Sequence, residues 1–225
     1  MTCCHCEATE RQFGKAVARR NLKSYRQKGP DRTTRLLLEA IRATGLRSTT
    51  LLDIGAGVGV VHHELLADVS ESAVHVEAAS AYLAAARRES ERRGHGERVR
   101  FVHGDFTDLA EELPESDIVT LNRVLCCYPD LERLLAASAR KARRLYAASY
   151  PRDRWYLKAA VFLHNAVRWL NGNEFRAYVH PVARIDELLS AAGLTRRSCR
   201  DTFVWRIASS SRSHEEGEGP ASGSS

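Results

Sequence analysis

The stretch Leu51-Leu-Asp-Ile-Gly-Ala-Gly-Val-Gly59 decides how the rest of this 225-residue chain is interpreted. A short apolar run leads into three closely spaced glycines, and a helical pattern follows. This order predicts a strand, a loop whose backbone can approach a ligand closely, and a helix whose N-terminus favours negative charge. A dinucleotide-binding G-x-G-x-x-G loop would place glycine at the sixth position, where this chain has Val60. The fit is instead to Asp-x-Gly-x-Gly-x-Gly, and Asp53 before the turn suits a ligand that carries an ammonium group.

Outside this stretch, apolar runs alternate with helical patterns. Helices are expected at residues 9–28 and 31–45, and further helices after most of the strands. The predicted strands are residues 50–54, 73–76, 99–103, 117–121 and 145–149, followed by an antiparallel pair at 195–199 and 203–208. Strand–helix alternation of this kind predicts an α/β fold in which helices cover both faces of a parallel sheet.

The chain divides into three parts. Residues 1–47 form an N-terminal helical cap, residues 48–208 form the domain with the sheet, and residues 209–225 form a tail. The tail holds no hydrophobic residue larger than alanine. Such a segment cannot offset the entropy lost on ordering, so the tail is predicted to be disordered. The helix at 9–28 ends in a basic stripe of Arg19, Lys23 and Arg26, which we expect at the rim of a substrate pocket.

Composition excludes several classes of protein. Hydrophobic residues make up 44% of the chain, which is enough for a real core. Charges interrupt every apolar stretch well before the roughly 18 residues of a membrane span, and residues 1–10 contain no apolar run. We therefore expect a cytoplasmic protein with no membrane partner. The formal charge of +6 is concentrated in residues 1–50, which hold 11 basic and 4 acidic residues. Because no stacking aromatics alternate with these charges, we expect no nucleic-acid partner.

Acidic and polar side chains follow the later strands at regular positions. Glu77 stands 20 residues past Gly57, Asp105 follows the third strand, and Asn122 follows the fourth. Together with the glycine loop, these residues make residues 48–208 resemble the class I S-adenosylmethionine-dependent methyltransferases. The resemblance implies a methyltransferase enzyme with S-adenosyl-L-methionine as cofactor. It also implies a Rossmann-like, doubly wound sheet of seven mostly parallel strands with an N-terminal helical cap.

The resemblance assigns roles to particular residues. The loop residues would hold the methionine part of the cofactor, with Asp53 near its amino group. Glu77 would accept the ribose hydroxyls, Asp105 would read the adenine amino group beside Phe106, and Asn122 would lie behind the methionine part. The predicted cofactor-binding set is Asp53, Gly55, Ala56, Gly57, Gly59, Glu77, Asp105, Phe106 and Asn122.

The methyl acceptor is less strongly indicated. The stretch Asn122-Arg-Val-Leu-Cys-Cys-Tyr-Pro129 is similar to small-molecule methyltransferases, and the second half of the chain resembles magnesium-protoporphyrin O-methyltransferases. We therefore expect O-methylation of a small, anionic acceptor. Methyl transfer mainly needs alignment of the acceptor, and a base only where a proton must leave. The candidates for catalytic contact are Tyr25, Arg26, Arg123 and His180, with Tyr128 and Tyr150 nearby.

Two alternative functions stay open, the first because of the six cysteines and the second because of the basic N-terminus. Cys3-Cys4-His5-Cys6 is too compressed for a usual zinc spacing, so no metal site is expected. If these thiols met Cys126 and Cys127, however, the chain would be a thiol-cluster metalloid methyltransferase or a metal sensor. The other alternative is a non-catalytic or RNA-associated cofactor-binding domain. No pattern in the sequence indicates an oligomeric state.

Overall fold

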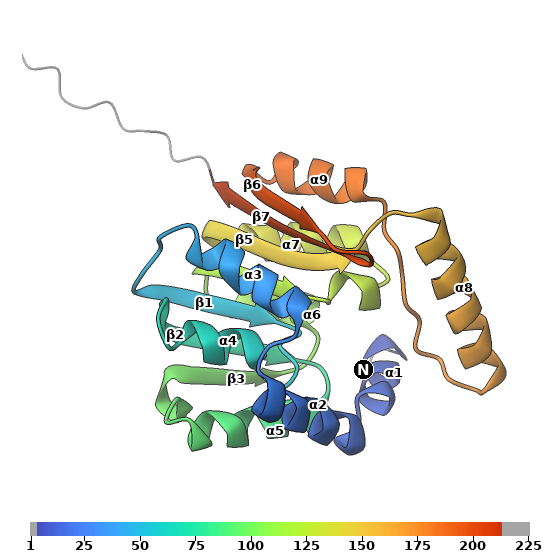
Figure 1. The fold of residues 1–225 in the computed structure, drawn as a ribbon, viewed down its shortest axis with the longest axis horizontal. Coiled ribbons are helices and arrows are strands. Elements are labelled where there is room, and N and C mark those ends of the chain that lie inside the picture. Colours follow the sequence, from blue (N-terminus) through green and yellow to red (C-terminus); the bar gives the residue numbers. More distant parts are fainter. Residues whose placement is uncertain (1–3, 213–225) are drawn as a thin grey trace, which may run out of the picture.

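The computed structural model describes residues 4–212, and side chains from residue 8 onward. The chain folds into a central sheet with helices on both sides (Figure 1). The helices are α1 (Cys4–Gln12), α2 (Lys15–Lys28), α3 (Arg32–Arg42), α4 (Val60–Leu65), α5 (Ser80–Arg92), α6 (Phe106–Leu109), α7 (Leu131–Arg140), α8 (Trp155–Leu170) and α9 (Val182–Ala191). The strands are β1 (Thr49–Ile54), β2 (Ser70–Glu77), β3 (Val99–His103), β4 (Ser116–Asn122), β5 (Ala142–Pro151), β6 (Leu194–Asp201) and β7 (Trp205–Arg212). Three short 3-10 helices are η1 (Gly96–Arg98), η2 (Ala110–Glu112) and η3 (Leu125–Cys127).

The seven strands lie in the order β3-β2-β1-β4-β5-β7-β6. Strands β1 to β5 pair in parallel, and β7 is antiparallel to both β5 and β6. The predicted Rossmann-like, mostly parallel sheet is thus confirmed, as is the terminal antiparallel pair. Because β1 lies between β2 and β4, the direction of winding reverses beside β1. In open α/β sheets a ligand binds at this reversal, outside the carboxyl ends of the strands.

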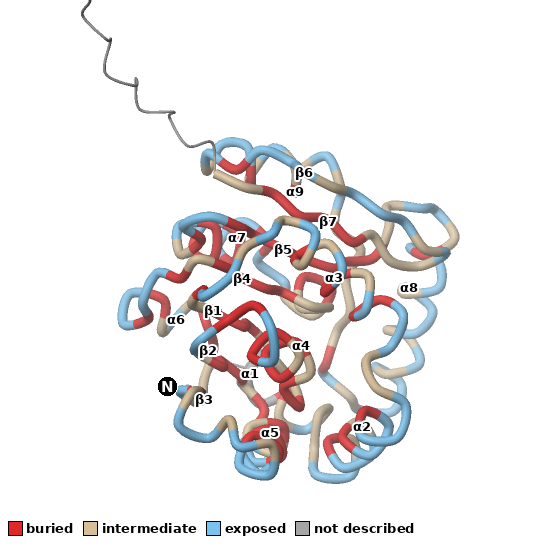
Figure 2. Tube along the Cα trace, turned by 60° about the vertical axis from the view of Figure 1, so that its left-hand side comes forward, coloured by how far each residue is buried: buried red, intermediate tan, exposed pale blue. Residues whose placement is uncertain are grey.

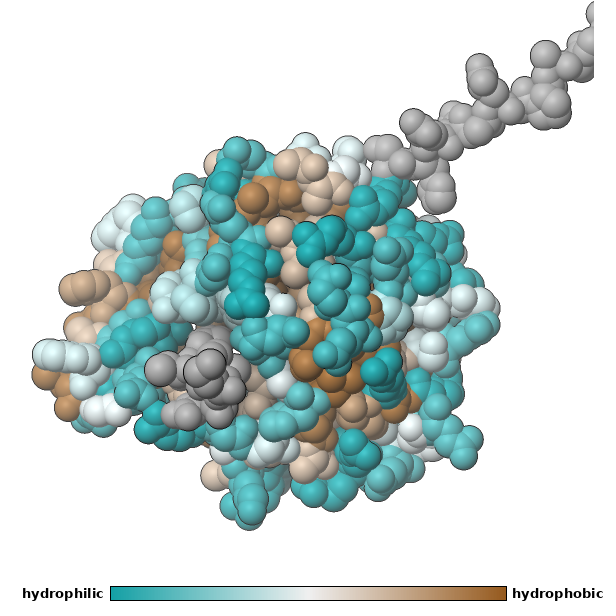
Figure 3. Space-filling model, turned by 180° about the vertical axis from the view of Figure 1, so that it is seen from behind, coloured by the Kyte–Doolittle hydropathy of each residue, from teal (hydrophilic) through white to brown (hydrophobic). Residues whose placement is uncertain are grey.

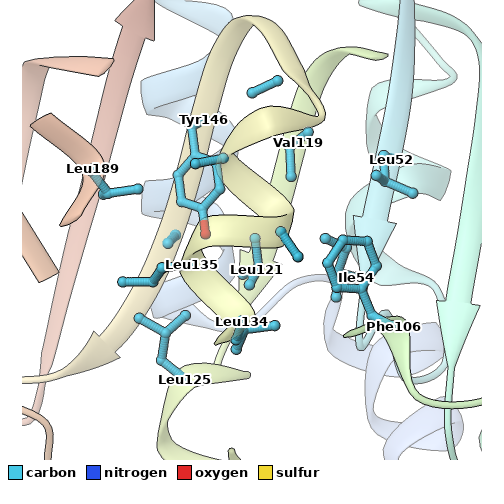
Figure 4. Packing of buried hydrophobic residues seen from close by; sticks show 14 of the residues in the cluster. Leu52, Ile54, Phe106, Val119, Leu121, Leu125, Leu134, Leu135, Tyr146 and Leu189 are labelled. Atoms are coloured by element: carbon cyan, nitrogen blue, oxygen red, sulfur yellow. The ribbon is translucent and has the colours of Figure 1, made fainter. Parts of the chain in front are cut away.

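Alternate residues of β1 point to opposite faces of the sheet. Leu51 belongs to the buried cluster that includes Leu37 of α3 and Leu65 of α4. Leu52 belongs to the cluster on the other face, which α6, α7 and α9 cover. Figure 4 shows part of this second cluster, with Tyr146 of β5 beside the leucines of α7. Figure 2 shows the same division, since the central strands β1, β4 and β5 are buried along most of their length, the edge strand β6 is largely exposed, and the helices are exposed on their outer sides.

The N-terminal helices pack on α5 at one end of the sheet. Tyr25 of α2 is buried in a cluster with Tyr82 of α5, and Phe13 packs against this cluster. The single helix predicted at 9–28 is wrong, because the helix is broken between α1 and α2. Gly14 is the N-cap of α2 and has extended backbone angles. The helical spacing of apolar residues continues across this break, so periodicity alone did not show it.

Two predicted boundaries also differ from the structure. The strand predicted at 145–149 is β5, which begins earlier, at Ala142, soon after α7 ends at Arg140. Strand β7 continues to Arg212, so residues 209–212 belong to the sheet and not to the tail. Its pairing with β5 and β6 accounts for the extension. The remaining tail, 213–225, lies outside the described residues.

Helix α8 stands apart from the sheet and has an unusual surface. Leu157 is its one residue classed as buried, whereas Trp155 and Phe162 are 80% and 76% exposed. Its inner side is partly polar, since Asn165 exchanges two hydrogen bonds with the backbone of Ala177. Figure 3 shows apolar side chains along the left edge of the molecule, where α8 lies. No helix among the described residues is long and apolar enough to cross a membrane.

Candidate functional site

A cavity of about 620 Å³ lies at the carboxyl ends of β1, β2 and β4, under α2 and the start of α3. It is therefore located at the reversal of the sheet, where a ligand is expected. Eight of the nine predicted cofactor-binding residues line it, and Gly59 does not. These eight are Asp53, Gly55, Ala56, Gly57, Glu77, Asp105, Phe106 and Asn122. Five further lining residues were not predicted from the sequence, namely Gly29, Pro30, Asp31, Thr34 and Trp205.

The glycines of the loop serve different purposes. Gly57 has φ +59, and a Cβ at this position would meet nothing within 4 Å. Its missing side chain therefore leaves open space in the wall of the cavity. Gly59 has φ +86, and a Cβ there would lie 2.4 Å from the ring of His62. Gly59 thus allows α4 to begin tightly against a buried histidine, which explains why it lies behind the cavity wall.

Glu77 at the end of β2 connects two backbone segments. Its Oε2 accepts a hydrogen bond from the N–H of Gly57 at 2.8 Å, and its Oε1 accepts one from Ala79 at 2.9 Å. Burial raises the pKa of this carboxyl above its ordinary value, although the two N–H groups act in the opposite direction. The carboxylate therefore fixes the glycine loop against β2 and also forms part of the cavity wall.

Asp105 begins α6 and holds a tyrosine beside the cavity. Its carboxylate accepts a hydrogen bond from the N–H of Thr107 at 2.8 Å, which is an N-cap contact. The hydroxyl of Tyr128 donates to the same carboxylate at 3.0 Å. Burial, together with the Asp105 carboxylate, raises the pKa of Tyr128. Phe106 is buried in the core below and lies next to Ile54 in Figure 4.

The residues after β4 join the cavity to α3. The amide of Asn122 donates to the hydroxyl of Thr34 at 3.0 Å, and its carbonyl accepts from Ser149 at 2.7 Å. Arg123 has φ +64 and places its guanidinium 5.1 Å above the ring of Trp205. The same guanidinium forms an ion pair with Asp31, the N-cap of α3. These contacts hold a cation in the wall of the cavity.

Three buried histidines lie beneath the glycine loop, and the sequence analysis did not identify them. The ring of His62 lies 4.2 Å from that of His63 and 5.0 Å from that of His75, between ring centroids. Asp53 accepts a hydrogen bond from Thr120 at 2.7 Å and lies 3.4 Å from Nδ1 of His62. Burial, followed by His62 and Arg93, lowers the pKa of His63 to about 2. Burial also lowers the pKa of His75, so the rings of His63 and His75 are neutral packing elements of the fold.

Of the four predicted catalytic candidates, Tyr25 and Arg123 line the cavity, whereas Arg26 and His180 do not. Tyr25 lines the cavity, but its hydroxyl donates to Glu64 at 2.7 Å, and burial followed by that hydrogen bond raises its pKa. Nε2 of His180 lies 3.0 Å from the carbonyl oxygens of both Leu125 and Tyr128. His180 therefore fastens the segment before α9 to the loop after β4, and it is not among the residues that line the cavity. Tyr150 is buried in the sheet core and also lies outside the lining.

Arg26 lies elsewhere than the sequence analysis placed it. Its guanidinium pairs at 2.7 Å with Glu89 of α5, whose side chain is fully buried, and it does not line the cavity. Arg19 and Lys23 are exposed and are also absent from the cavity wall. The predicted cationic rim formed by this stripe is therefore wrong. The helical spacing was sound, but it could not show that the partner of Arg26 is a carboxylate on α5.

This placement leads to a prediction about stability. Arg26→Glu should lower the free energy of unfolding by roughly 1–3 kcal/mol, because a hydrogen bond to a buried charge is replaced by repulsion. Urea unfolding at pH 7 measures the change. Arg19→Glu, one exposed position on the same helix, is the control and should change stability by less than about 0.5 kcal/mol. Equal effects of the two substitutions would contradict the pairing with Glu89.

Residues 52–144 match the family model of a methyltransferase domain. The chain carries a methyltransferase domain. The matched residues include the glycine loop, Glu77, Asp105 and Asn122, and they end within β5. The match confirms the methyltransferase class expected from the sequence. Two solved structures with the same fold hold S-adenosylhomocysteine or S-adenosylmethionine, the latter being the cofactor expected from the sequence.

Solved structures share the fold of this methyltransferase domain. A magnesium protoporphyrin IX methyltransferase from Synechocystis PCC 6803, with bound S-adenosylmethionine, is 20% identical at a TM-score of 0.63, and the match covers 92% of this chain and 90% of that one. A protein of the O-methyltransferase family from Burkholderia thailandensis is 20% identical at a TM-score of 0.72, covering 92% and 64%. A complex of the Trm112 methyltransferase activator from Haloferax volcanii matches at 15% identity and a TM-score of 0.65, covering 93% and 100%. No curated protein matches the sequence significantly.

Proposed function

We propose that this chain transfers the methyl group of S-adenosylmethionine to a carboxylate oxygen of a small acceptor. The residues of the cavity fit such a cofactor. Gly57 leaves space in the wall, and Asp53, Glu77 and Asp105 supply carboxylates around a ligand that carries positive charge. Asp53 and Glu77 would hold its amino group and ribose, and Asp105 with Phe106 its adenine.

The kinds of residues in the cavity wall favour a carboxylate as the methyl acceptor. Among the described residues that line the cavity there is no histidine or lysine, and Arg123 is the one basic residue. The lining tyrosines Tyr25, Tyr82 and Tyr128 all have raised pKa values, to which burial contributes most. The carboxylates of the wall are engaged, Asp31 by Arg123 and the others by the proposed contacts with the cofactor, so none is left to act as a general base for the acceptor. A carboxylate needs none, because it is already ionised at neutral pH.

The protein's contribution to the reaction is then mainly positioning. The bound cofactor supplies an electrophilic methyl group on a sulfonium. Arg123 would hold one acceptor oxygen through a charge-assisted hydrogen bond, in exchange for part of its contact with Asp31. Stacking on Trp205 fixes the plane of the guanidinium, so the carboxylate is aligned rather than merely attracted. The helices α2 and α3 close the cavity from above and limit the access of water.

The type of bond formed tests the reaction. The full chain is incubated with S-adenosylmethionine labelled in the methyl group and a panel of carboxylic acids, including porphyrin acids, beside matched amines and phenols. Methyl esters release labelled methanol in mild alkali, whereas N-methyl and aryl ether products do not. We expect alkali-labile label with one or more of the acids. Label that is found solely in alkali-stable products would contradict the proposal.

Arg123 supplies a second prediction, measured on an acid that is turned over. Arg123→Gln should raise KM by roughly 10–100-fold, because a charge-assisted hydrogen bond contributes about 1.5–3 kcal/mol. The change in kcat should be much smaller, since binding common to the ground state and the transition state is lost. Arg26→Gln is the control outside the cavity and should leave KM unchanged. An unaltered KM in Arg123→Gln, with a folded protein by thermal unfolding, would refute the contact.

A further inference from the structure

Two adjacent thiols lie in the wall of the same cavity. Cys126 and Cys127 are free cysteines in η3, directly after β4, and both line the cavity. Their sulfur atoms lie 3.6 Å apart. Neither residue has a part in the binding of the cofactor or the acceptor as described above. The pair is therefore a reactive group that the methyl-transfer reaction leaves unused.

The surrounding structure holds the two sulfurs in place. The thiol of Cys126 donates to the carbonyl oxygen of Arg123 at 3.3 Å, and that of Cys127 lies 3.7 Å from the same oxygen. The backbone is fixed as well, because the carbonyl of Cys126 accepts from the N–H of Tyr178 at 2.8 Å. The hydrogen bond from Cys127 lowers the pKa of the Cys126 thiol, and the same bond raises that of Cys127. The two thiols are thus coupled to each other and held against one carbonyl oxygen.

The separation suits a single soft atom bound by both sulfurs. Two sulfurs at about 2.3 Å from one soft atom lie roughly 3.3–3.8 Å apart, for bond angles between that of a pyramidal and that of a tetrahedral centre. The observed 3.6 Å falls within this range. Soft thiolates select soft ligands.

The site offers two donor atoms, the sulfurs of Cys126 and Cys127, and this number limits which ligands it can hold. Among the described side chains, residues 8–212, no three or more of histidine, cysteine, aspartate or glutamate are grouped so as to hold a metal ion. Two sulfurs leave a structural zinc site half complete. A trivalent arsenical differs, because it uses two bonds to the protein and keeps its third for an organic group. The cavity offers room for that group beside Val124 and Leu134.

We propose that Cys126 and Cys127 form a dithiol site that binds a trivalent arsenical on the wall of the methyl-transfer cavity. Two As–S bonds form, and the oxygen on arsenic leaves as one water molecule with the two thiol protons, so arsenic is neither oxidised nor reduced. The site depends on the geometry of the thiols and not on the nature of the methyl acceptor. Cys126 and Cys127 are two of the thiols that the sequence pattern indicated for a metalloid site.

The probe for the test is phenylarsine oxide, added to the full-length reduced protein. The three N-terminal cysteines need a control of their own, because Cys3 lies outside the described residues and the side chains of Cys4 and Cys6 do too. They are therefore replaced by serine in the parent protein for the experiment. We expect this parent to bind one equivalent of the arsenical by intact mass spectrometry and calorimetry. The dithiol 2,3-dimercaptopropanol should reverse the binding, and an equal concentration of a monothiol should not.

Single substitutions locate the site. Cys126→Ser and Cys127→Ser should each weaken binding by more than about 100-fold, since one As–S bond is lost. Cys199→Ser removes an exposed cysteine on β6 and should leave binding unchanged. Thermal unfolding and binding of S-adenosylhomocysteine show that each variant is folded. One equivalent that persists in both single variants, or no binding by the parent protein, would overturn the proposal whatever the acceptor proves to be.

Discussion

We expect Gly57→Val to abolish binding of the cofactor without unfolding the protein. The backbone of Gly57 has φ +59, and its Cβ position faces open space in the cavity. A branched side chain there would occupy the volume that the ligand needs. Affinity for S-adenosylhomocysteine, measured by calorimetry, should fall by more than about 100-fold, which corresponds to about 2.7 kcal/mol.

A control variant must separate the effect of backbone strain on ligand affinity from the effect of lost space in the cavity. Gly94 follows α5, has φ +72, and likewise has nothing within 4 Å of its Cβ position, but it does not line the cavity. Gly94→Val therefore imposes a similar strain, about 1–2 kcal/mol for a left-handed residue with a side chain, away from the site. We expect it to lower the melting temperature as much as Gly57→Val does and to bind ligand normally. Equal affinities in the two variants would rule out Gly57 as part of the cofactor site.

The second large effect is on the pH dependence of stability. The pKa values of His63 and His75 are both lowered on folding, mainly by burial, whereas in the unfolded chain they return to about 6.5. Above pH 6.5 both states are neutral at these positions, and stability does not depend on them. Below pH 6.5 the unfolded state binds protons that the folded state does not. Each histidine then lowers the free energy of unfolding by about 1.4 kcal/mol per pH unit.

Urea unfolding between pH 7.5 and 5 should therefore show a decline to which these two histidines contribute about 2.7 kcal/mol per pH unit at the acidic end. His63→Leu should remove about half of that slope and cost little at pH 7.5, because neither ring nitrogen of His63 has a hydrogen-bond partner among the described residues. His164→Leu, at an exposed position on α8, is the matched control and should leave the slope unchanged. The carboxylate of Glu89 acts at lower pH, since its arginine partners hold its pKa below the ordinary value despite burial. An unchanged slope in His63→Leu would contradict the account.

The parts of the fold that could be predicted are those that depend on the local order of residues. Strand, glycine loop and helix around Leu51–Gly59 follow from residue order alone, and a sheet of parallel strands places Glu77, Asp105 and Asn122 at one edge. The spacing of these residues therefore sufficed to collect them around one cavity. That these residues contact the cofactor stays a prediction, which the Gly57 experiment addresses first.

What could not be predicted depends on partners distant in the chain. The ion pair of Arg26 with Glu89 and the stacking of Arg123 on Trp205 join residues more than 60 positions apart. Buried histidines carry no periodic signal, because they stand where an apolar residue would be expected. The adjacent pair at 62 and 63, in a helix that begins against Gly59, was the one sign available.

Substitutions in helix α8 should lower the free energy of unfolding less than substitutions in the sheet. With one buried side chain, Leu157, substitutions along its outer face remove little from the hydrophobic core. Sequence can therefore diverge in this segment between related proteins while the sheet and the glycine loop stay constant. The exposed tryptophans of α8 have no role in holding the sheet together, and their retention or loss among relatives would report directly on selection for something other than folding.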